Sequence, residues 1–325
     1  LGKDAYEDDG RKRENPNPEA YRNSKSLRFY SRFERDGSQD SHFVVTPYLR
    51  YTEMEFLQHF LPGTPLEENG ERSVGVQTAF YQQSSDKLTL HNGFDMELSQ
   101  AYLEQQQDSA GFGPFPQGKH YDYEIDARYF AWFVGGDYEV NDTTRLNFGG
   151  RYDIQFYDYD NRMISGNTAD DGTPCATGNG TCRYARPDDQ SERFRNWSFH
   201  GGVVHQLNAH HSLTANLAHG FRAPQASELY RLQNQQLTSK LEEELLNSAE
   251  IGLRGEWQDF SYRSAVYWLQ KDDVIIQDSN RQNINGGRTE SRGLELEVNW
   301  ALTEQLRRVR HPVGREHQIE VAVVV

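Results

Sequence analysis

The sequence has no long apolar run and little overall hydrophobicity. No stretch of about 18 apolar residues occurs in its 325 residues, which excludes a transmembrane helix. Hydrophobic residues make up 35%, and the mean hydropathy of -0.88 is low for a packed soluble core. Disorder is disfavoured because 18 Tyr, 17 Phe and 5 Trp accompany this composition. A transmembrane β-barrel remains possible, because its strands need apolar residues only at every second position.

Basic charge and cysteine are also scarce. The net charge of -15 argues against a nucleic-acid partner. It is explained equally well by acidic loops that keep the molecule soluble and by a steering role for the charge. The two cysteines, Cys175 and Cys182, lie in GTPCATGNGTCRY without His or Cys companions for a metal site. This spacing favours a small loop disulfide and an oxidising compartment, and two free thiols are the alternative. The polar start of the chain has neither Met nor a signal peptide, so we expect an internal piece of a longer protein.

Strict alternation of apolar and polar residues is the dominant pattern. In TTRLNFGGRYDIQF, apolar side chains such as Phe148 share one face and polar ones such as Arg151 share the other. RNWSFHGGVVHQL and HSLTANLAHGF each exceed ten residues, whereas strands of ordinary domains average five or six. About ten tilted residues cross the roughly 25 Å apolar band of an outer-membrane barrel. The pattern therefore favours membrane-spanning strands.

Short and long connections alternate along the chain. Short polar turns are predicted near 36–41, 83–86, 140–143, 207–211, 257–260 and 301–304. Long polar loops are predicted near 54–72, 100–122, 158–192, 223–246 and 277–287. Short turns at one end and long loops at the other are typical of an antiparallel, up-and-down transmembrane β-barrel. The turns divide the chain into about eleven strands, so the fold class is all-β.

Each predicted strand has one lumen-facing side and one lipid-facing side. Placing its charges in hydrocarbon would cost about 2 to 4 kcal/mol for each Arg or Lys at mid-depth, which determines the register. The residues predicted to face inward are Arg28, Arg32, Glu34, Asp95, Glu97, Arg145, Arg151, Asp153, Glu250, Arg254, Glu256, Glu295 and Glu297. Those predicted to face lipid are Phe29, Phe33, Phe94, Met96, Phe148, Tyr152, Ile251, Leu253, Leu294, Leu296 and Val298.

Two further features are predicted from residue type and spacing. Aromatic residues near the strand ends suggest interfacial girdles, because amphipathic rings favour that depth. The girdle candidates are Tyr48, Tyr51, Tyr157, Tyr159, Trp257 and Trp300. In SKLEEELLNSAEIGL, Leu241, Leu245 and Leu246 have helical spacing and predict a short loop helix before a strand that starts near Asn247.

Three segments carry a family resemblance. LNAHHSLTANLAHGFRAPQASELY, GGDYEVNDTTRLNFGGRYD and NINGGRTESRGLELEVNW resemble barrel strands of TonB-dependent outer-membrane receptors of the siderophore type, and the similarity covers roughly residues 20 to 304. The resemblance implies a 22-stranded barrel around an N-terminal plug domain. It also implies import of a ferric chelate with energy from the TonB-ExbB-ExbD complex, in the outer membrane of a Gram-negative bacterium.

The sequence departs from the family pattern in several places. It has no TonB box, no plug domain, about half of the strands and no C-terminal strand ending in an aromatic residue. We therefore expect a receptor fragment, with a barrel segment at 1–304 and a tail at 305–325 that does not look like its native continuation. The TonB contact would belong to the missing N-terminal region of the parent.

Arg222 stands where an alternating strand gives way to a Pro-containing loop. Pro224 prevents further regular pairing, so Arg222 is expected at the lumen wall near the end of the strand. Its guanidinium could bind loop carbonyls or a plug carboxylate, or hold an anionic ligand, and a structural role is favoured. The other ligand-binding candidates are Tyr230, Arg231, Phe112, Phe115 and Tyr121, because Tyr and Arg dominate many binding hot spots. The alternative is that these loops pack on themselves.

Catalytic, cofactor and metal signatures are missing from the sequence. There is no Gly-x-Ser-x-Gly elbow, no His-Glu-x-x-His motif and no phosphate-binding Gly loop, so no enzyme activity and no cofactor are predicted. His210 and His211 are predicted to be solvated in a turn, and Asp272 and Asp273 lack the oxygen-rich loop of a calcium site. The remaining alternatives are a passive porin-like or adhesive barrel and a soluble β-sandwich binding module.

Overall fold

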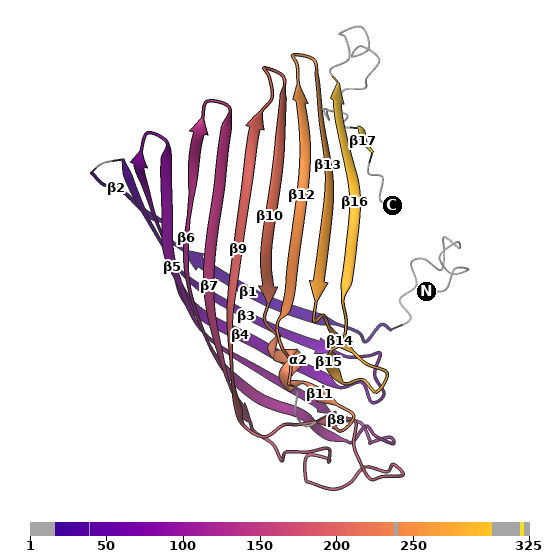
Figure 1. The fold of residues 1–325 in the computed structure, drawn as a ribbon. Helices are drawn as coiled ribbons and strands as arrows, with labels where there is room; N and C mark the ends of the chain where they lie inside the picture. The colour runs from indigo at the N-terminus through magenta and orange to yellow at the C-terminus, as the bar shows by residue number, and fades with distance from the viewer. Residues whose placement is uncertain (1–16, 39, 237–239, 301–318, 322–325) are drawn as a thin grey trace.

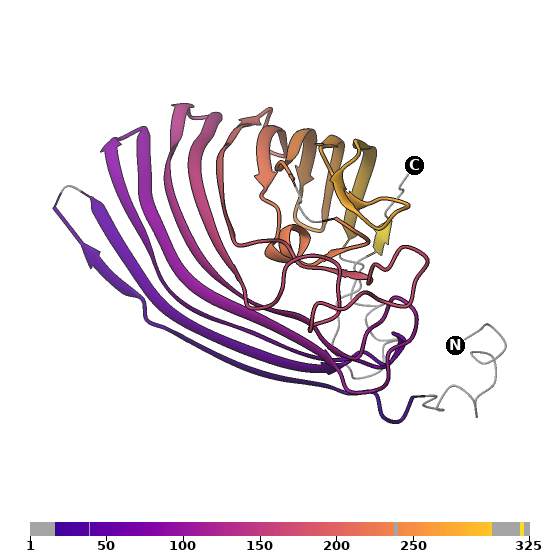
Figure 2. The same ribbon diagram turned by 90° about the horizontal axis from the view of Figure 1, so that it is seen from below.

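A computed structural model describes residues 17–38, 40–236, 240–300 and 319–321. Long antiparallel strands form one curved sheet, and a helix and loops lie on its concave side (Figures 1 and 2). The sheet consists of β1 (Arg22–Tyr30), β2 (Phe33–Asp36), β3 (Ser41–Leu57), β4 (Leu66–Ser85), β5 (Leu88–Gln107), β6 (Gly118–Asn141), β7 (Thr144–Asn161), β9 (Gln190–Gln206), β10 (His211–Arg222), β12 (Glu244–Glu256), β13 (Phe260–Asp272), β16 (Thr289–Trp300) and β17 (Ile319–Val321). The small elements are α2 (Ala226–Tyr230), β8 (Tyr184–Ala185), β11 (Leu232–Gln233), β14 (Ile275–Gln277) and β15 (Asn283–Asn285).

Each long strand pairs with the next one along the chain. The order is β1-β3-β4-β5-β6-β7-β9-β10-β12-β13-β16-β17, which is an up-and-down meander. β1 and β2 pair with successive parts of β3, so together they make one interrupted strand. Counted in this way, the described residues before β17 form eleven long strands, and the predicted all-β antiparallel class is confirmed. Among the described residues all the long strands belong to one sheet, and the only other sheets are the two-stranded pairs β8–β11 and β14–β15, so the β-sandwich alternative is wrong.

Five of the six predicted turns are confirmed, the sixth, at 301–304, lies outside the described residues, and the loops predicted at 54–72 and 100–122 are too long. Short connections join β2 to β3, β4 to β5, β6 to β7, β9 to β10 and β12 to β13. At the other end the strands continue into segments predicted as loops: β4 starts at Leu66, β5 runs to Gln107, and β6 starts at Gly118 and has 24 residues. About ten residues suffice to span an outer-membrane barrel, so these strands extend well beyond the apolar band.

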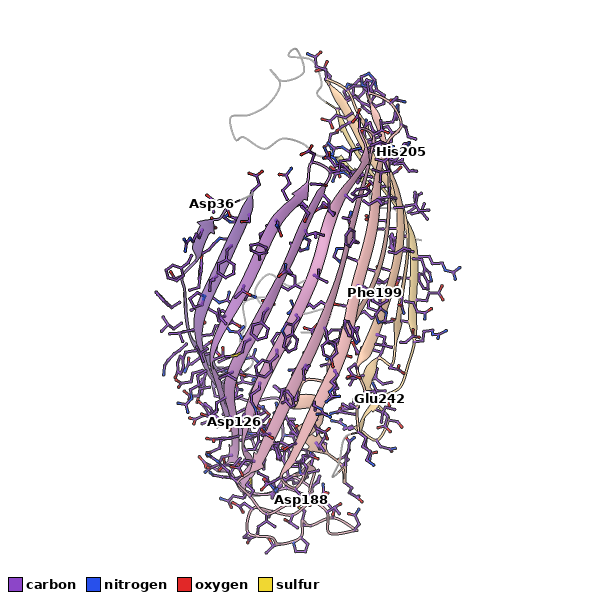
Figure 3. The ribbon with its side chains drawn as sticks, turned by 60° about the vertical axis from the view of Figure 1, so that its left-hand side comes forward. Asp36, Asp126, Asp188, Phe199, His205 and Glu242 are labelled. Carbon is purple, nitrogen blue, oxygen red and sulfur yellow. A yellow bond between two sulfur atoms is a disulfide. The ribbon has the colours of Figure 1, made fainter. Side chains whose placement is uncertain are left out.

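The register shows which residues face the concave side. Tyr157 and Tyr159 of β7 pack against α2, which lies on the concave side (Figure 2), so the odd-numbered residues of β7 face the lumen. Arg151 and Asp153 share that face, whereas Phe148 and its even-numbered neighbours point to the convex side. The predicted division between lumen and lipid is therefore correct for this strand. Phe199, also on the convex face, lies midway along β9 (Figure 3) and is 58% exposed.

Two local predictions are wrong. Leu245 and Leu246 belong to β12, and the helix of this loop is α2, earlier in the chain, because β12 pairs with β10 and β13 from its first residues. Three of the girdle candidates face the concave side instead of the lipid. Tyr48 donates a hydrogen bond to Glu97, and Tyr157 and Tyr159 pack in a cluster with the loops. The proposed tail at 305–325 lies outside the described residues except for β17, whose backbone pairs with β16.

None of the helices among the described residues is both long and apolar enough to cross a membrane. Cys175 and Cys182 form a disulfide within the loop between β7 and β9. This loop, the loop that contains α2 and the β14–β15 hairpin all lie at the same end of the sheet (Figure 1). The candidate functional site is built from these loops and therefore lies at that end of the sheet.

Candidate functional site

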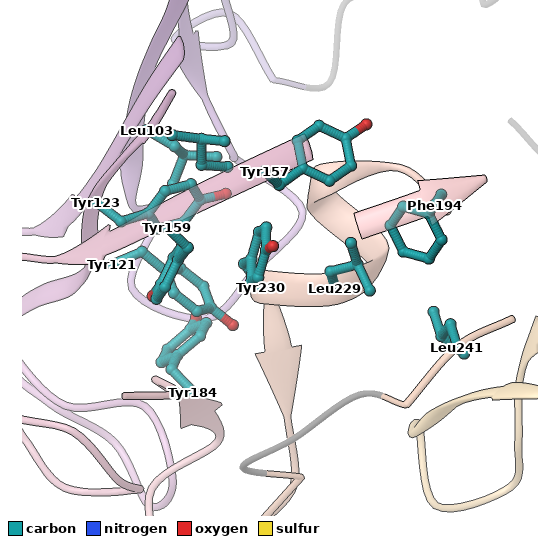
Figure 4. Packing of buried hydrophobic residues seen from close by; sticks show 11 residues of the cluster. Leu103, Tyr121, Tyr123, Tyr157, Tyr159, Tyr184, Phe194, Leu229, Tyr230 and Leu241 are labelled. Atoms are coloured by element: carbon teal, nitrogen blue, oxygen red, sulfur yellow. The ribbon is translucent and has the colours of Figure 1, made fainter. Parts of the chain in front are cut away.

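An aromatic cluster lies on the concave side where the long loops fold back onto the sheet. Tyr230 of α2 stacks on Tyr159 of β7, with ring centroids 4.4 Å apart and 16° between the planes (Figure 4). Tyr121 donates a hydrogen bond to the carbonyl of Leu232 at 2.5 Å. The cluster comprises Leu103, Tyr121, Tyr123, Ile125, Tyr157, Tyr159, Tyr184, Phe194, Leu229, Tyr230 and Leu241. This packing holds the loop that contains α2 and the loop between β7 and β9 against the concave face of the sheet.

Arg222 joins three segments of the chain through two carboxylates. Its Nε and Nη2 donate to the two carboxylate oxygens of Glu244, both at 2.8 Å. Its Nη1 and Nη2 donate to those of Glu228 at 2.9 and 3.1 Å. Glu228 also accepts from the backbone N–H of Gln225 at 2.7 Å, and Glu244 accepts from that of Ile275 at 2.8 Å. Arg222 therefore holds α2 against the ends of β10 and β12.

Arg231 has a similar role further across the wall. Its guanidinium forms an ion pair with Glu67 of β4, whose side chain is only 4% exposed. Glu67 also accepts hydrogen bonds from Gln58 and Gln105. Residues that are 164 positions apart in the sequence are thus joined in a buried polar network. The network is stable because each buried group has a partner.

The network continues from Gln105 to His120 in β6, beyond the apolar band. The His120 ring nitrogens contact the side-chain oxygen of Gln105 at 3.1 Å and the carbonyl of Pro116 at 2.9 Å, and the ring stacks on Tyr184. Burial lowers the pKa of His120 to about 4, so the imidazole is neutral at pH 7. It acts as a packing and hydrogen-bonding group.

Arg186 anchors the loop between β7 and β9. Its buried guanidinium donates to the carbonyls of Ile164 at 2.7 Å and Thr168 at 2.9 Å, and no carboxylate of the described residues contacts it. Burial lowers the pKa of Arg186 because the charged form loses its hydration. One fully buried arginine thus holds several turns of this loop in place.

Two cations near this loop have no carboxylate partner among the described residues. The Arg183 guanidinium lies 5.3 Å from the ring centroid of Phe115, and Arg281 approaches it from the β14–β15 hairpin. Burial, and then the positive charge of Arg281, lowers the pKa of Arg183. A bound anion can stabilise two like charges that act on each other in this way.

The six predicted ligand-binding residues are in different environments. Tyr121 and Tyr230 are buried, Arg222 and Arg231 are paired with glutamates, and Phe115 packs against the aromatic cluster. Only Phe112, which is 74% exposed at the tip of the β5–β6 connection, presents its ring freely to solvent. Sequence reasoning missed Arg183 and Arg281, and their only signal was a cation in a polar loop.

Ion pairs also line the concave wall away from the loops. Arg151 of β7 contacts Asp95 of β5 at 2.8 Å and Asp153 at 3.0 Å. Tyr129 bonds both Arg151 and Asp153. Charges of both signs therefore face the lumen at this height, as the sequence predicted. Within the part of the chain that the structure describes, no three His, Cys, Asp or Glu residues are grouped as metal ligands.

A meander of long tilted strands, apolar outside and ion-paired inside, with long loops folded over one end, defines a segment of a transmembrane β-barrel. Residues 2–311 match the family described as "TonB dependent receptor-like, beta-barrel", and the chain belongs to this family. It is accordingly a protein of the Gram-negative outer membrane. In barrels of this kind the long loops face the extracellular side. Membership of a receptor family agrees with the prediction that the chain is not an enzyme.

Solved structures share this fold at low sequence identity. The ferric-catecholate import receptor Fiu from K12 E. coli is 13% identical, with a TM-score of 0.63 over 88% of this chain and 46% of its own. The ferric yersiniabactin uptake receptor FyuA from Yersinia pestis is 14% identical, with a TM-score of 0.60 over 87% and 40%. The copper transporter OprC is 17% identical, with a TM-score of 0.64 over 88% and 45%. A comparison with curated proteins finds no match. The chain spans less than half the length of these receptors.

Proposed function

We propose that this chain is part of an outer-membrane active transporter that binds a ferric siderophore or a similar scarce chelate and imports it with TonB-supplied energy. Family membership supports a receptor, and two structural neighbours are named as receptors for the import of ferric chelates. A third is named a copper transporter, so the fold alone does not determine the cargo. The partners in this proposal are a ferric chelate, the TonB-ExbB-ExbD complex through the N-terminal region of the parent, and outer-membrane lipid.

The pair Arg183 and Arg281 is the observation that favours an anionic chelate. The chain carries a net charge of -15, yet the positive charge of Arg281 acts on Arg183, and neither guanidinium has a carboxylate partner among the described residues. The ring of Phe115 lies beside them and that of Phe112 is exposed at the same tip. Cations next to aromatic rings bind anionic chelates by charge and by stacking on their flat groups.

The buried networks supply the rigidity that this surface needs. Arg222, Arg231 and Arg186 are already satisfied by carboxylates or carbonyls, so they hold the loops and are not available to a ligand. A loop surface ordered before binding loses less conformational entropy when it captures a ligand. The mixed charges on the lumen wall then offer a polar path inward.

The domain boundaries form part of this proposal. Residues 1–304 would be the barrel segment, which the family match over residues 2–311 supports. Residues 305–325 would form a separate tail, of which only β17 is described, and β17 pairs with β16.

The test uses the full-length receptor in a strain from which its gene is deleted. Growth on single ferric siderophores and uptake of radioactive iron identify the ligand, and a protonophore tests the need for energy. Arg183→Gln with Arg281→Gln should weaken binding about tenfold, because each exposed pair contributes about 0.5 to 1 kcal/mol. Arg28→Gln with Arg254→Gln removes the same charge from the lumen wall and should leave binding unchanged.

Three results would count against the proposal. If the deletion loses no iron source, the siderophore cargo is wrong. If uptake continues in the protonophore, a passive porin-like barrel is the better description. If the Arg183 and Arg281 variant binds as tightly as the control, the ligand contacts other residues.

A further inference from the structure

The convex face carries a layer of arginines where its apolar band ends. On β6, β7 and β9, the outward residues between the short turns and this layer are mainly apolar, with glycines among them, as the register shows. They include Phe130, Trp132, Val134, Tyr138, Leu146, Phe148, Tyr152, Ile154, Phe156, Trp197, Phe199 and Val203. At the extracellular edge of this band, in register with Phe156 and Ile154 of β7, the outward positions on β6 and β9 are Arg128, Arg193 and Arg195.

These three arginines lie close together. Arg128 pairs across the sheet with Phe156, and Phe156 pairs with Arg193, so the two arginines are two strands apart, or about 10 Å. Arg195 is two residues from Arg193 on the same face, about 7 Å along the strand, and pairs with Ile154. The three arginine positions therefore lie close together at the extracellular edge of the apolar band.

The arginines differ in their partners. Arg128 forms an ion pair with Asp158 and lies 5.8 Å from the ring centroid of Phe156. Arg193 and Arg195 are exposed, and among the described residues no carboxylate, hydroxyl or ring contacts either side chain. Arg193 and Arg195 thus present two unpaired positive charges on the outer face of a chain whose net charge is -15.

Their depth indicates the chemistry of the partner. Trp197 lies two residues below Arg195, and its ring centroid is 4.5 Å from that of Tyr152, which places an aromatic belt there. A group just beyond such a belt lies at the level of lipid headgroups. A guanidinium presents paired N–H donors that match phosphate oxygens, and such hydrogen bonds are strong where water is partly excluded.

We propose that Arg193 and Arg195, with Arg128 beside them, bind the phosphate groups of a phosphorylated lipid of the outer leaflet, whose acyl chains lie along Phe156 and Trp197. The site is on the outside of the barrel, away from the loops and the lumen. It depends on the membrane-spanning fold and not on the transported cargo. Failure of the transport proposal would therefore leave it unaffected.

The test measures lipid binding to the full-length receptor by native mass spectrometry after delipidation in detergent. Diphosphorylated lipid A is the probe, and dephosphorylated lipid A with the same acyl chains is the lipid control. Arg193→Gln with Arg195→Gln should weaken binding of the probe at least tenfold and leave binding of the dephosphorylated lipid unchanged. Arg28→Gln with Arg254→Gln, which removes two lumen-facing charges, is the matched protein control and should bind the probe like the unmodified receptor. Heat-modifiability gels establish that all variants are folded.

The proposal is supported if the loss is confined to the phosphorylated lipid and to the outward-facing variant. It is overturned if both double variants bind the probe equally, or if the dephosphorylated lipid binds as tightly as the probe. Competition by millimolar inorganic phosphate would also overturn it, because the two arginines would then hold a free anion without recognising a lipid.

Discussion

Replacing Arg222 with glutamine should release the loop that contains α2 without unfolding the barrel. The substitution keeps a polar side chain of similar length but removes both ion pairs. Glu244 is then left with the backbone N–H of Ile275 as its donor, although its side chain is only 11% exposed. Glu228 keeps the N–H of Gln225 and faces Glu244 without a cation between them.

The magnitude follows from these contacts. Removing one partner of a fully buried ion pair costs about 3 to 5 kcal/mol. Arg222 is 36% exposed and Glu228 is 23% exposed, so water restores part of the lost solvation. We therefore expect a local loss of about 2 to 3 kcal/mol, which is roughly a 30- to 150-fold rise in the opening of the loop.

Hydrogen exchange of the peptides that cover residues 223–236 measures this opening. Arg222→Lys keeps the charge but cannot bind both carboxylates with paired donors. Its exchange rate in residues 223–236 should therefore lie between those of the unmodified protein and Arg222→Gln. Arg254→Gln removes an ion pair with Glu256 near a turn and should change exchange in residues 223–236 by less than twofold. Unchanged protection in Arg222→Gln would show that the clamp does not hold the loop.

Three further predictions follow from the same structure. Leu217→Arg should destabilise the folded barrel by about 2 to 4 kcal/mol in a urea titration in liposomes, whereas Ala218→Arg on the lumen side should cost less than half as much; equal losses would contradict the assigned faces. His120 should titrate near pH 4 by NMR, and titration near pH 6.5 would contradict its burial. Because the unfolded chain binds this proton near pH 6.5, the free energy of unfolding should fall by on the order of 3 kcal/mol as the pH drops from 6.5 to 4. Cys175→Ser with Cys182→Ser should destabilise its own loop by roughly 2 kcal/mol, seen as faster local exchange, with no change in heat modifiability.

Much of the barrel wall could be predicted from the sequence. The alternation around Phe148 and Leu217 assigns each residue to a face, because successive side chains of a strand point to opposite sides. The polar turns mark one end of the strands, because they interrupt the alternation. Where alternation continues past the membrane, as in β6, the sequence does not show where lipid ends and water begins.

The candidate site was much less predictable. Glu228 lies in the same motif as Arg222, so this pair had a local signal, and the structural role favoured for Arg222 agrees with its contacts. Glu244 and Glu67 had no local sequence signal, because their arginine partners come from segments that meet them only when the loops fold onto the concave face of the sheet. The same folding buries Tyr157 and Tyr159, which were expected in a girdle.

The sequence by itself determined the strands, their order and the two chemical faces of the wall, because these depend on a two-residue period and on turns between neighbours. Only the tertiary structure decided how the loops lie and which charges they neutralise. Loop placement depends on contacts between residues far apart in the chain, such as Arg231 and Glu67, and no local pattern encodes such a distance.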